Sequence, residues 1–333
     1  MKRIMKKLLL LSLPFVLAFS FFFTFEPYDW LGLKGEHWYM TGAISSKREL
    51  LLKQPENLIF GDSHIANLNT GYIASVGGGD WTMMAYGGAT LGESIADFWW
   101  ATEHTEMKNV VFGLSFYSMN DNHFAARHET AVNNAESIFT FVADYAHWHE
   151  AWQNLQVKVM DIAADFTGNE ALRIFTDNPS SLTQDTRPAT VYGEDGRRED
   201  LVAYSQHIVA ATQGGYSCFG YCEQLGEIID YCDANGINIT FVLFPSHDII
   251  WQEVITPLSI GNHILYYKDF LKSRATVLDM ELQNELSATD GVFLDGFHVV
   301  LEQKKEFARV IFAGEQADYC VRTTPESYAA DRS

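Results

Sequence analysis

The stretch NLIFGDSH, residues 57–64, decides the fold of this chain. Its apolar run is followed at once by Gly61, Asp62 and Ser63. A short, nearly continuous apolar run that stops at glycine is typical of a strand buried on both faces of a parallel sheet. The stretch therefore predicts a strand over residues 57–60, with Ser63 on the turn at its C-terminal end.

Four further apolar runs end at Gly, Pro or a turn, and they cover residues 81–86, 109–117, 237–244 and 275–279. Helix-like stretches lie between or after them, at residues 91–105, 222–235 and 301–312. The second of these ends at Gly236, a residue type that commonly terminates helices. The alternation of strands and helices predicts an α/β fold, with a mainly parallel sheet covered by helices on both faces.

Residues 122–216 interrupt this alternation. A mostly helical stretch, 131–166, precedes a polar stretch that contains Gly and Pro, 176–200. Because ligands of open α/β sheets bind beyond the C-terminal ends of the strands, we interpret the segment as an insertion or cap over that edge. Helix packing and a sugar-binding cleft are the two interpretations of its aromatic cluster, which consists of His147, Trp148, His149 and Trp152.

The N-terminal segment predicts a membrane helix. Four basic residues precede an uncharged run rich in Leu and Phe, residues 8–25. The run is long enough to cross a bilayer core, and the basic residues favour a cytoplasmic N-terminus. A cleaved signal peptide shares this pattern, but no A-x-A cleavage motif follows the run. We expect an anchor with the domain on the periplasmic or extracellular face; a cleaved segment would instead make the protein secreted.

These features predict the division of the chain. We expect a cytoplasmic tip and transmembrane anchor over residues 1–28, a stem over 29–56, an α/β domain with its insertion over 57–320, and a tail over 321–333.

Composition narrows the function. The chain has 333 residues, 47% of them apolar, and a formal net charge of −20. Such a chain buries a core, and its acidic surface argues against nucleic acid as a partner, because phosphate binding needs clustered Lys and Arg. The chain has four cysteines, Cys218, Cys222, Cys232 and Cys320. We interpret them as disulfides of an exported protein or as buried thiols, in preference to a zinc site. We expect neither a metal nor a cofactor.

Two short motifs supply the residue types of a serine nucleophile and its base. Ser63 follows the first strand, and the sequence Asp295-Gly-Phe-His298 precedes the last helix-like stretch. Asp295 and His298 can both face inward from one loop, so that the carboxylate orients the imidazole while its other ring nitrogen meets Ser63. The spacing predicts a Ser-His-Asp triad.

These motifs together resemble the SGNH (GDSL-like) hydrolase superfamily, over residues 57–122 and 217–313. The resemblance implies a three-layer α/β/α, flavodoxin-like fold in which Ser63 is the nucleophile, His298 the base and Asp295 its orienter. It also implies that the Ser63 N–H is an oxyanion donor.

The second and third sequence blocks of the superfamily concern the remaining oxyanion donors. Gly88 stands at the position of the second block. The third block is usually Gly-x-Asn-Asp, but here Asn120 and Asp121 come too far beyond Gly113. Either Asn120 reaches the oxyanion hole through a longer loop, or Tyr117 or Ser115 fills its place, or the third donor is missing.

Further side chains near the predicted site are candidates for substrate binding. They are Asp62, His64, Tyr117 and His247. Adjacent residues on a turn point apart, so His64 is expected to have a substrate-binding or structural role rather than to act as the base. For His247, a place in the site wall and a place in an exposed loop are both open.

Two functions follow from the resemblance. The first is an exported serine esterase or O-acyltransferase, acetyl being the expected group, that acts on a cell-surface polysaccharide. Its partners would be a carbohydrate or acyl-ester substrate, the membrane and a multi-pass membrane acyltransferase. The second is a non-catalytic glycan-binding or scaffold subunit of a polysaccharide-modifying complex, favoured by the altered third block. An extracellular lipase-like esterase is less well supported, because nothing in the sequence marks an acyl-chain tunnel.

Overall fold

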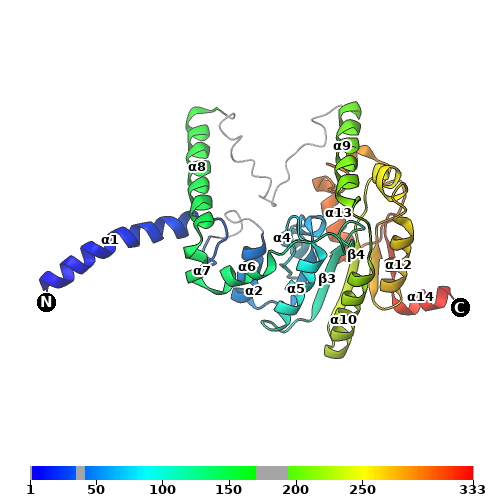
Figure 1. Ribbon diagram of the computed structural model, residues 1–333, viewed down its shortest axis with the longest axis horizontal. Helices are drawn as coiled ribbons and strands as arrows, with labels where there is room; N and C mark the ends of the chain where they lie inside the picture. The colour runs from blue at the N-terminus through cyan, green and yellow to red at the C-terminus, as the bar shows by residue number, and fades with distance from the viewer. Residues whose placement is uncertain (1, 35–41, 170–193, 333) are drawn as a thin grey trace. The chain divides into compact units, whose positions relative to one another are not determined.

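The computed structural model describes residues 2–34, 42–169 and 194–332 of the chain (Figure 1). It divides into two compact units. The first comprises Met1–Leu52 and Glu129–Ser181, and the second comprises Lys53–His128 and Leu182–Ser333. The two units are described in turn.

The second unit is built on a six-stranded sheet with the strand order β2-β1-β3-β4-β5-β6. The first five strands are parallel, and β6 is antiparallel to β5. The strand bounds are β1 Asn57–Gly61, β2 Thr82–Met83, β3 Asn109–Leu114, β4 Asn238–Leu243, β5 Thr276–Asp279 and β6 Val321–Thr323. The predicted α/β class with a mainly parallel sheet is confirmed.

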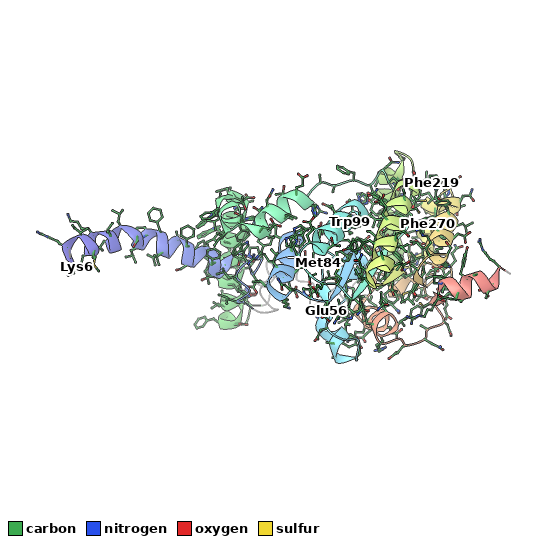
Figure 2. All side chains as sticks on the ribbon, turned by 90° about the horizontal axis from the view of Figure 1, so that it is seen from below. Lys6, Glu56, Met84, Trp99, Phe219 and Phe270 are labelled. Atoms are coloured by element: carbon green, nitrogen blue, oxygen red, sulfur yellow. The ribbon has the colours of Figure 1, made fainter. Side chains whose placement is uncertain are left out.

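Helices cover both faces of this sheet. Helix α5 (Leu91–Thr102) packs on β1, α10 (Phe219–Asn235) on β4 and α12 (Gly261–Lys272) on β5, and α10 contacts both of the others. Trp99, Phe219 and Phe270 mark these three helices in Figure 2. Helices α4 (Thr70–Ser75) and α13 (Leu301–Phe312) pack together. Helix α4 connects β1 to β2, and α5 connects β2 to β3 in the opposite direction across the sheet. Because β-α-β crossovers are right-handed, α4 lies on the face opposite to α5, and the fold has three layers.

Several boundaries agree with the sequence interpretation and others differ. Gly236 caps α10 with a φ of 67°, as its position predicts. The strands are shorter than the apolar runs, most of all β2, because their outer residues pass into turns. Residues 321–333, expected as a tail, instead form β6 and α14 (Pro325–Asp331), and Thr323 pairs with Val277 of the sheet.

The first unit is helical. It contains α1 Lys2–Phe25, α2 Ala43–Lys53, α6 His128–Glu136, α7 Ile138–Ala143 and α8 Tyr145–Thr167. The helical interpretation of 131–166 is therefore confirmed, and the expected stem contributes α2 and a buried Trp30. Most of the polar stretch 176–200 lies outside the described residues, and its end belongs to α9 (Glu194–Thr212) of the second unit.

An aromatic core joins α1 to the insertion. Phe22 of α1 is fully buried, and its ring lies 5.5 Å from that of Phe141 and 4.5 Å from that of Trp148. His147 is buried and hydrogen-bonded to the Phe141 carbonyl at 2.7 Å. Helix packing, rather than a sugar cleft, therefore accounts for His147 and Trp148. Helix α1 as a whole is long and apolar enough to cross a membrane, with a mean hydropathy of 2.3 in an 18-residue window.

The turn after β1 depends on two glycines that face each other in the sheet. Gly61 pairs with Gly113 of β3, and Ile65 of helix α3 (Ser63–Ala66) lies over both. A Cβ atom at Gly113 would meet the Cβ of Ile65 at 2.6 Å, a distance that real side chains do not reach. Gly61 has a φ of 139°, which L side chains rarely adopt. The absence of side chains here allows α3 to lie directly on the sheet.

We predict that Gly113→Ala displaces Ile65 and lowers the free energy of unfolding by about 1–3 kcal/mol, the usual cost of overpacking. Thermal unfolding followed by far-ultraviolet circular dichroism measures the effect. Gly261→Ala is the matched control, because Gly261 begins α12 and a Cβ there meets nothing within 4 Å. Equal melting temperatures for the two variants would contradict the close approach of α3 to the sheet.

Candidate active site

Ser63 stands at the first position of α3, immediately beyond the C-terminal end of β1. Asp62 is the N-cap of this helix, and its carboxylate accepts the backbone N–H of His64 at 2.9 Å. The first N–H groups of a helix have no partner within the helix, and they point outward from its N-terminus. The Ser63 N–H is one of these donors.

The loop Asp295–His298 is folded by its own carboxylate. Asp295 Oδ1 accepts the backbone N–H groups of Phe297, at 2.9 Å, and of His298, at 2.7 Å. Its Oδ2 lies 2.8 Å from Nδ1 of His298. A three-residue spacing suffices because these bonds turn the loop back on itself.

The two motifs meet in the structure. His298 Nε2 lies 2.7 Å from Ser63 Oγ. Because an ionised carboxylate only accepts hydrogen bonds, Nδ1 of His298 carries the proton toward Asp295, and Nε2 accepts from the Ser63 hydroxyl. Ser63, His298 and Asp295 thus form one continuous hydrogen-bonded chain, with the geometry that a general base and its nucleophile require.

The charge of Asp295 is stabilised by this loop. Burial raises the pKa of Asp295, but the hydrogen bond and charge of His298 and the backbone donors outweigh burial, and the pKa lies below its usual value. The His298 side chain is 20% exposed, so solvent or a substrate can reach the ring.

Asp62 and His64 form a second histidine–carboxylate pair beside the first. His64 Nδ1 lies 2.6 Å from Asp62 Oδ1, and the His64 ring stacks on that of His298 at 5.5 Å with 23° between the planes. The side chains are only 9% and 6% exposed, respectively. His64 is therefore a nearly buried neighbour of His298, and its expected role as a substrate contact does not fit this position.

Tyr117 lies on the loop after β3 and is half-buried. Its ring lies 4.4 Å from that of His123 and 6.0 Å from that of Phe297, whose ring in turn meets the edge of His64. Burial and the charge of Asp62 raise the pKa of Tyr117. Tyr117 and His123 therefore form an aromatic wall near Asp62, and His123 is a residue that carried no signal in the sequence analysis.

Asn120 is committed to the loop that leads into α10. Its Oδ1 accepts the backbone N–H groups of Asn122, at 3.2 Å, and Ser217, at 3.4 Å, while its Nδ2 donates to the Gly215 carbonyl at 3.5 Å. Ser115 bonds within its own turn, to Ser118. Among the described residues, neither side chain hydrogen-bonds to Ser63 or His298, and the bonds of Asn120 hold the loop before α10.

Gly88 is exposed on the turn after β2, with a φ of 68°. Its carbonyl accepts Arg127 Nη2 at 2.5 Å, and Arg127 forms a fork with Glu93, at 2.9 and 2.7 Å. Arg127 is distant from Gly88 in sequence, so no local pattern marks it. Because Arg127 binds the carbonyl of Gly88 and not its N–H, that N–H stays the candidate second oxyanion donor.

His247 is buried, with both ring nitrogens engaged. Nδ1 accepts the Ile249 N–H at 3.1 Å, Nε2 lies 2.9 Å from Asp290, and the backbone N–H donates to the Gly296 carbonyl at 3.0 Å. Neither an exposed loop nor a substrate contact describes it. His247 instead supports the loop that carries His298.

Glu281 hydrogen-bonds to the backbone of the loop that carries Tyr117. This fully buried carboxylate accepts the Phe116 N–H at 2.8 Å and the Tyr267 hydroxyl, and Lys268 lies 3.6 Å away. Burial raises the pKa of Glu281. The Tyr216 hydroxyl, at 2.5 Å, binds the carbonyl of the same residue, Phe116, so both backbone groups are clamped.

The four cysteines are free thiols, three of them buried and Cys320 half-buried. The buried-thiol interpretation therefore describes Cys218, Cys222 and Cys232. Within the described ranges, no group of three or more potential metal ligands gathers.

No known family model matches this chain, and no curated protein matches it. Among solved structures, it is similar to a Bacteroides fragilis protein provisionally described as an acylhydrolase, with 9% identity and a TM-score of 0.37. The match covers 80% of this chain and 92% of that chain. At this TM-score, the likeness identifies neither a family nor an activity for this chain.

Proposed function

We propose that this protein is an exported, membrane-anchored serine esterase or O-acyltransferase that acts on a cell-surface polysaccharide. The observation that carries the proposal is the hydrogen-bonded chain from Ser63 Oγ through His298 to Asp295, at 2.7 and 2.8 Å. Such a chain activates a serine hydroxyl, which is a weak nucleophile by itself.

The mechanism follows from these contacts. Ser63 Oγ attacks the acyl carbonyl carbon while His298 Nε2 takes its proton, and the carbonyl oxygen becomes an oxyanion. The Ser63 N–H at the start of α3, with Gly88 as the second candidate, stabilises that charge. The C–O bond of the donor breaks as His298 returns the proton to the leaving oxygen. A sugar hydroxyl or water then gives its proton to His298 and attacks the acyl-Ser63 ester, and Ser63 is regenerated.

The wall of Tyr117 and His123 supports a carbohydrate acceptor. Half-buried aromatic rings present an apolar face to a sugar ring and a polar edge to its hydroxyls. A sugar hydroxyl is therefore the acceptor that we propose for the acyl group.

The end of α1 supports an anchor over a cleaved signal peptide. Phe22 is fully buried, and the buried Glu26 accepts the Tyr28 N–H at 2.7 Å and the Trp30 N–H at 3.1 Å. Cleavage in this region would remove part of a packed core. The membrane helix would keep the protein near a multi-pass acyltransferase, the partner that we propose for the transfer reaction.

The second candidate is a non-catalytic glycan-binding or scaffold subunit of a polysaccharide-modifying complex. Its support is the commitment of Asn120 to Gly215, Asn122 and Ser217, which deprives the site of the usual third oxyanion donor. Loss of one such donor lowers kcat by about a hundredfold to a thousandfold in serine hydrolases.

We predict that the full chain in detergent reacts with a fluorophosphonate probe and hydrolyses p-nitrophenyl acetate, and that Ser63→Ala abolishes both reactions. Ser273→Ala, at the exposed end of α12, is the control expected to behave like wild type. A soluble oligosaccharide in the assay distinguishes transfer from hydrolysis, because mass spectrometry detects an acetylated product. A folded wild type as inert as Ser63→Ala would favour the scaffold subunit.

We predict that Asp295→Asn lowers kcat by about 10³–10⁴, because the amide no longer holds His298 in the required tautomer. Asp233→Asn, at the exposed end of α10, is the control. The lowered pKa of Asp295 stabilises the fold above the usual carboxyl pKa of about 4, and that stabilisation is lost as the pH falls through the folded-state pKa. Denaturation at several pH values should therefore show a deficit for Asp295→Asn that shrinks in acid; a constant deficit would contradict this ionic role.

We predict that the mature protein keeps α1. Membranes washed with alkaline carbonate should retain the protein, and peptide mass spectrometry should recover residues from the 2–25 segment. A soluble form whose first residue lies beyond Phe25 would show that the segment is cleaved, despite the burial of Phe22.

A further inference from the structure

We propose that His64, paired with Asp62, is a positioning residue that holds the imidazole of His298 against Ser63, and that this pair sets the upper pH limit of the site. The inference rests on the proposed function, because it concerns the same base and nucleophile. It assigns a role to a buried pair that the triad mechanism does not use.

One carboxylate oxygen of Asp62 contacts both the backbone and the ring of His64. The same oxygen, Oδ1, accepts the His64 backbone N–H at 2.9 Å and lies 2.6 Å from ring atom Nδ1. The other ring nitrogen, Nε2, is buried and has no hydrogen-bond partner among the described residues. The orientation of the ring therefore depends on Asp62 alone among polar groups.

The His64 ring in turn packs against one face of the His298 ring. The two rings stack at 5.5 Å with an interplanar angle of 23°, and Phe297 closes the edge of His64 at 5.5 Å. Phe244, which follows β4, lies 5.9 Å away on another side. His298 is thus fixed by Asp295 at Nδ1, by Ser63 at Nε2 and by His64 across one face.

The charges around His64 favour its protonated form. The charged groups that act on it are Asp62 on its own turn, Asp295 on the loop of His298, and Glu281 beyond β5, while the His298 ring stacks on it. Burial lowers the pKa of His64, but the charge and hydrogen bond of Asp62, with Asp295 and Glu281, outweigh burial and raise it. Burial likewise raises the pKa of Asp62, and His64 outweighs it, so that this pKa is lowered.

The direction of the pH effect follows. A raised folded-state pKa means that the stabilisation by protonated His64 is complete below the usual histidine value of about 6.5 and is lost as the pH rises through the folded-state pKa. Above that pKa, buried Asp62 faces a neutral ring, and an uncompensated buried carboxylate is costly. The Ser63 turn and the stack on His298 then loosen together.

The test is the ratio of wild-type kcat to that of His64→Asn, measured across pH in the full chain with p-nitrophenyl acetate. Asn keeps a donor for Asp62 but carries neither a charge nor a ring. We expect a ratio of about ten at the wild-type optimum, since small displacements of a catalytic group cost that much or more. The ratio should fall toward one as the pH rises, and KM should not change, because His64 is buried beneath His298.

Two variants separate charge from packing. His64→Phe keeps a stacked ring without the pair, and Asp62→Asn removes the counter-ion. In both variants, the fall of kcat at high pH that wild type shows should be absent. His149→Asn, exposed on α8, is the matched control and should show the same fall of kcat at high pH as wild type. A ratio of wild type to His64→Asn that stays constant with pH would reduce His64 to a packing residue and overturn the proposal.

A second measurement separates this inference from the proposed function. In protein labelled with ¹⁵N-histidine, His64 should titrate above its usual range, and His298 should keep a proton on Nδ1 in wild type but become a tautomer mixture in His64→Asn. If wild type is inert toward the ester and the probe, the proposed function fails while these spectra still test the pair. A His64 that titrates at or below the usual value, or a His298 tautomer insensitive to His64→Asn, would refute the pairing.

Discussion

The close approach of helix α3 to the sheet is the constraint on which the site depends. Ile65 lies over Gly61 and Gly113, and a Cβ on either glycine would collide with it. The contact fixes the height of α3 above the sheet and thereby places the hydroxyl of Ser63. It also explains why His298, 235 positions away in sequence, can meet Ser63 at 2.7 Å.

The buried charges form a second level of organisation. Asp62 and Asp295 are each matched by a histidine, and Asp279 and Glu281 lie near Lys268. Hydrogen-bonded pairs of this kind offset the cost of burying a charge. The acidic residues that give the chain its net charge of −20 are therefore not all surface residues, because several support the loops that carry the site.

Local patterns predicted much of this structure, and contacts between distant residues account for what they missed. The apolar runs located the five parallel strands, because strands buried on both faces must be apolar throughout. Strand β6 escaped because it is only three residues long and mostly exposed. Ser63, Asp295 and His298 were predicted together because their motifs impose local turns, and the structure brings the three side chains into contact.

The misassigned residues have a common cause. Asn120 suits an oxyanion hole by its chemistry, but its partners, Gly215 and Ser217, are almost a hundred positions away. His247 was expected in the site wall or an exposed loop, and its partner Asp290 is equally invisible from a single motif. Arg127, His123 and Glu281 carried no signal, because their contacts exist only once the fold has formed.

The burial of Phe22 against Phe141 has a consequence for the synthesis of the protein. The two rings are separated by about 120 residues, so the end of α1 emerges long before its partners. At synthesis rates of about 5–20 residues per second, Phe22 waits for roughly 6–24 seconds with its ring uncovered. The helical unit can therefore close only after β1, β2 and β3 of the other unit have all been synthesised.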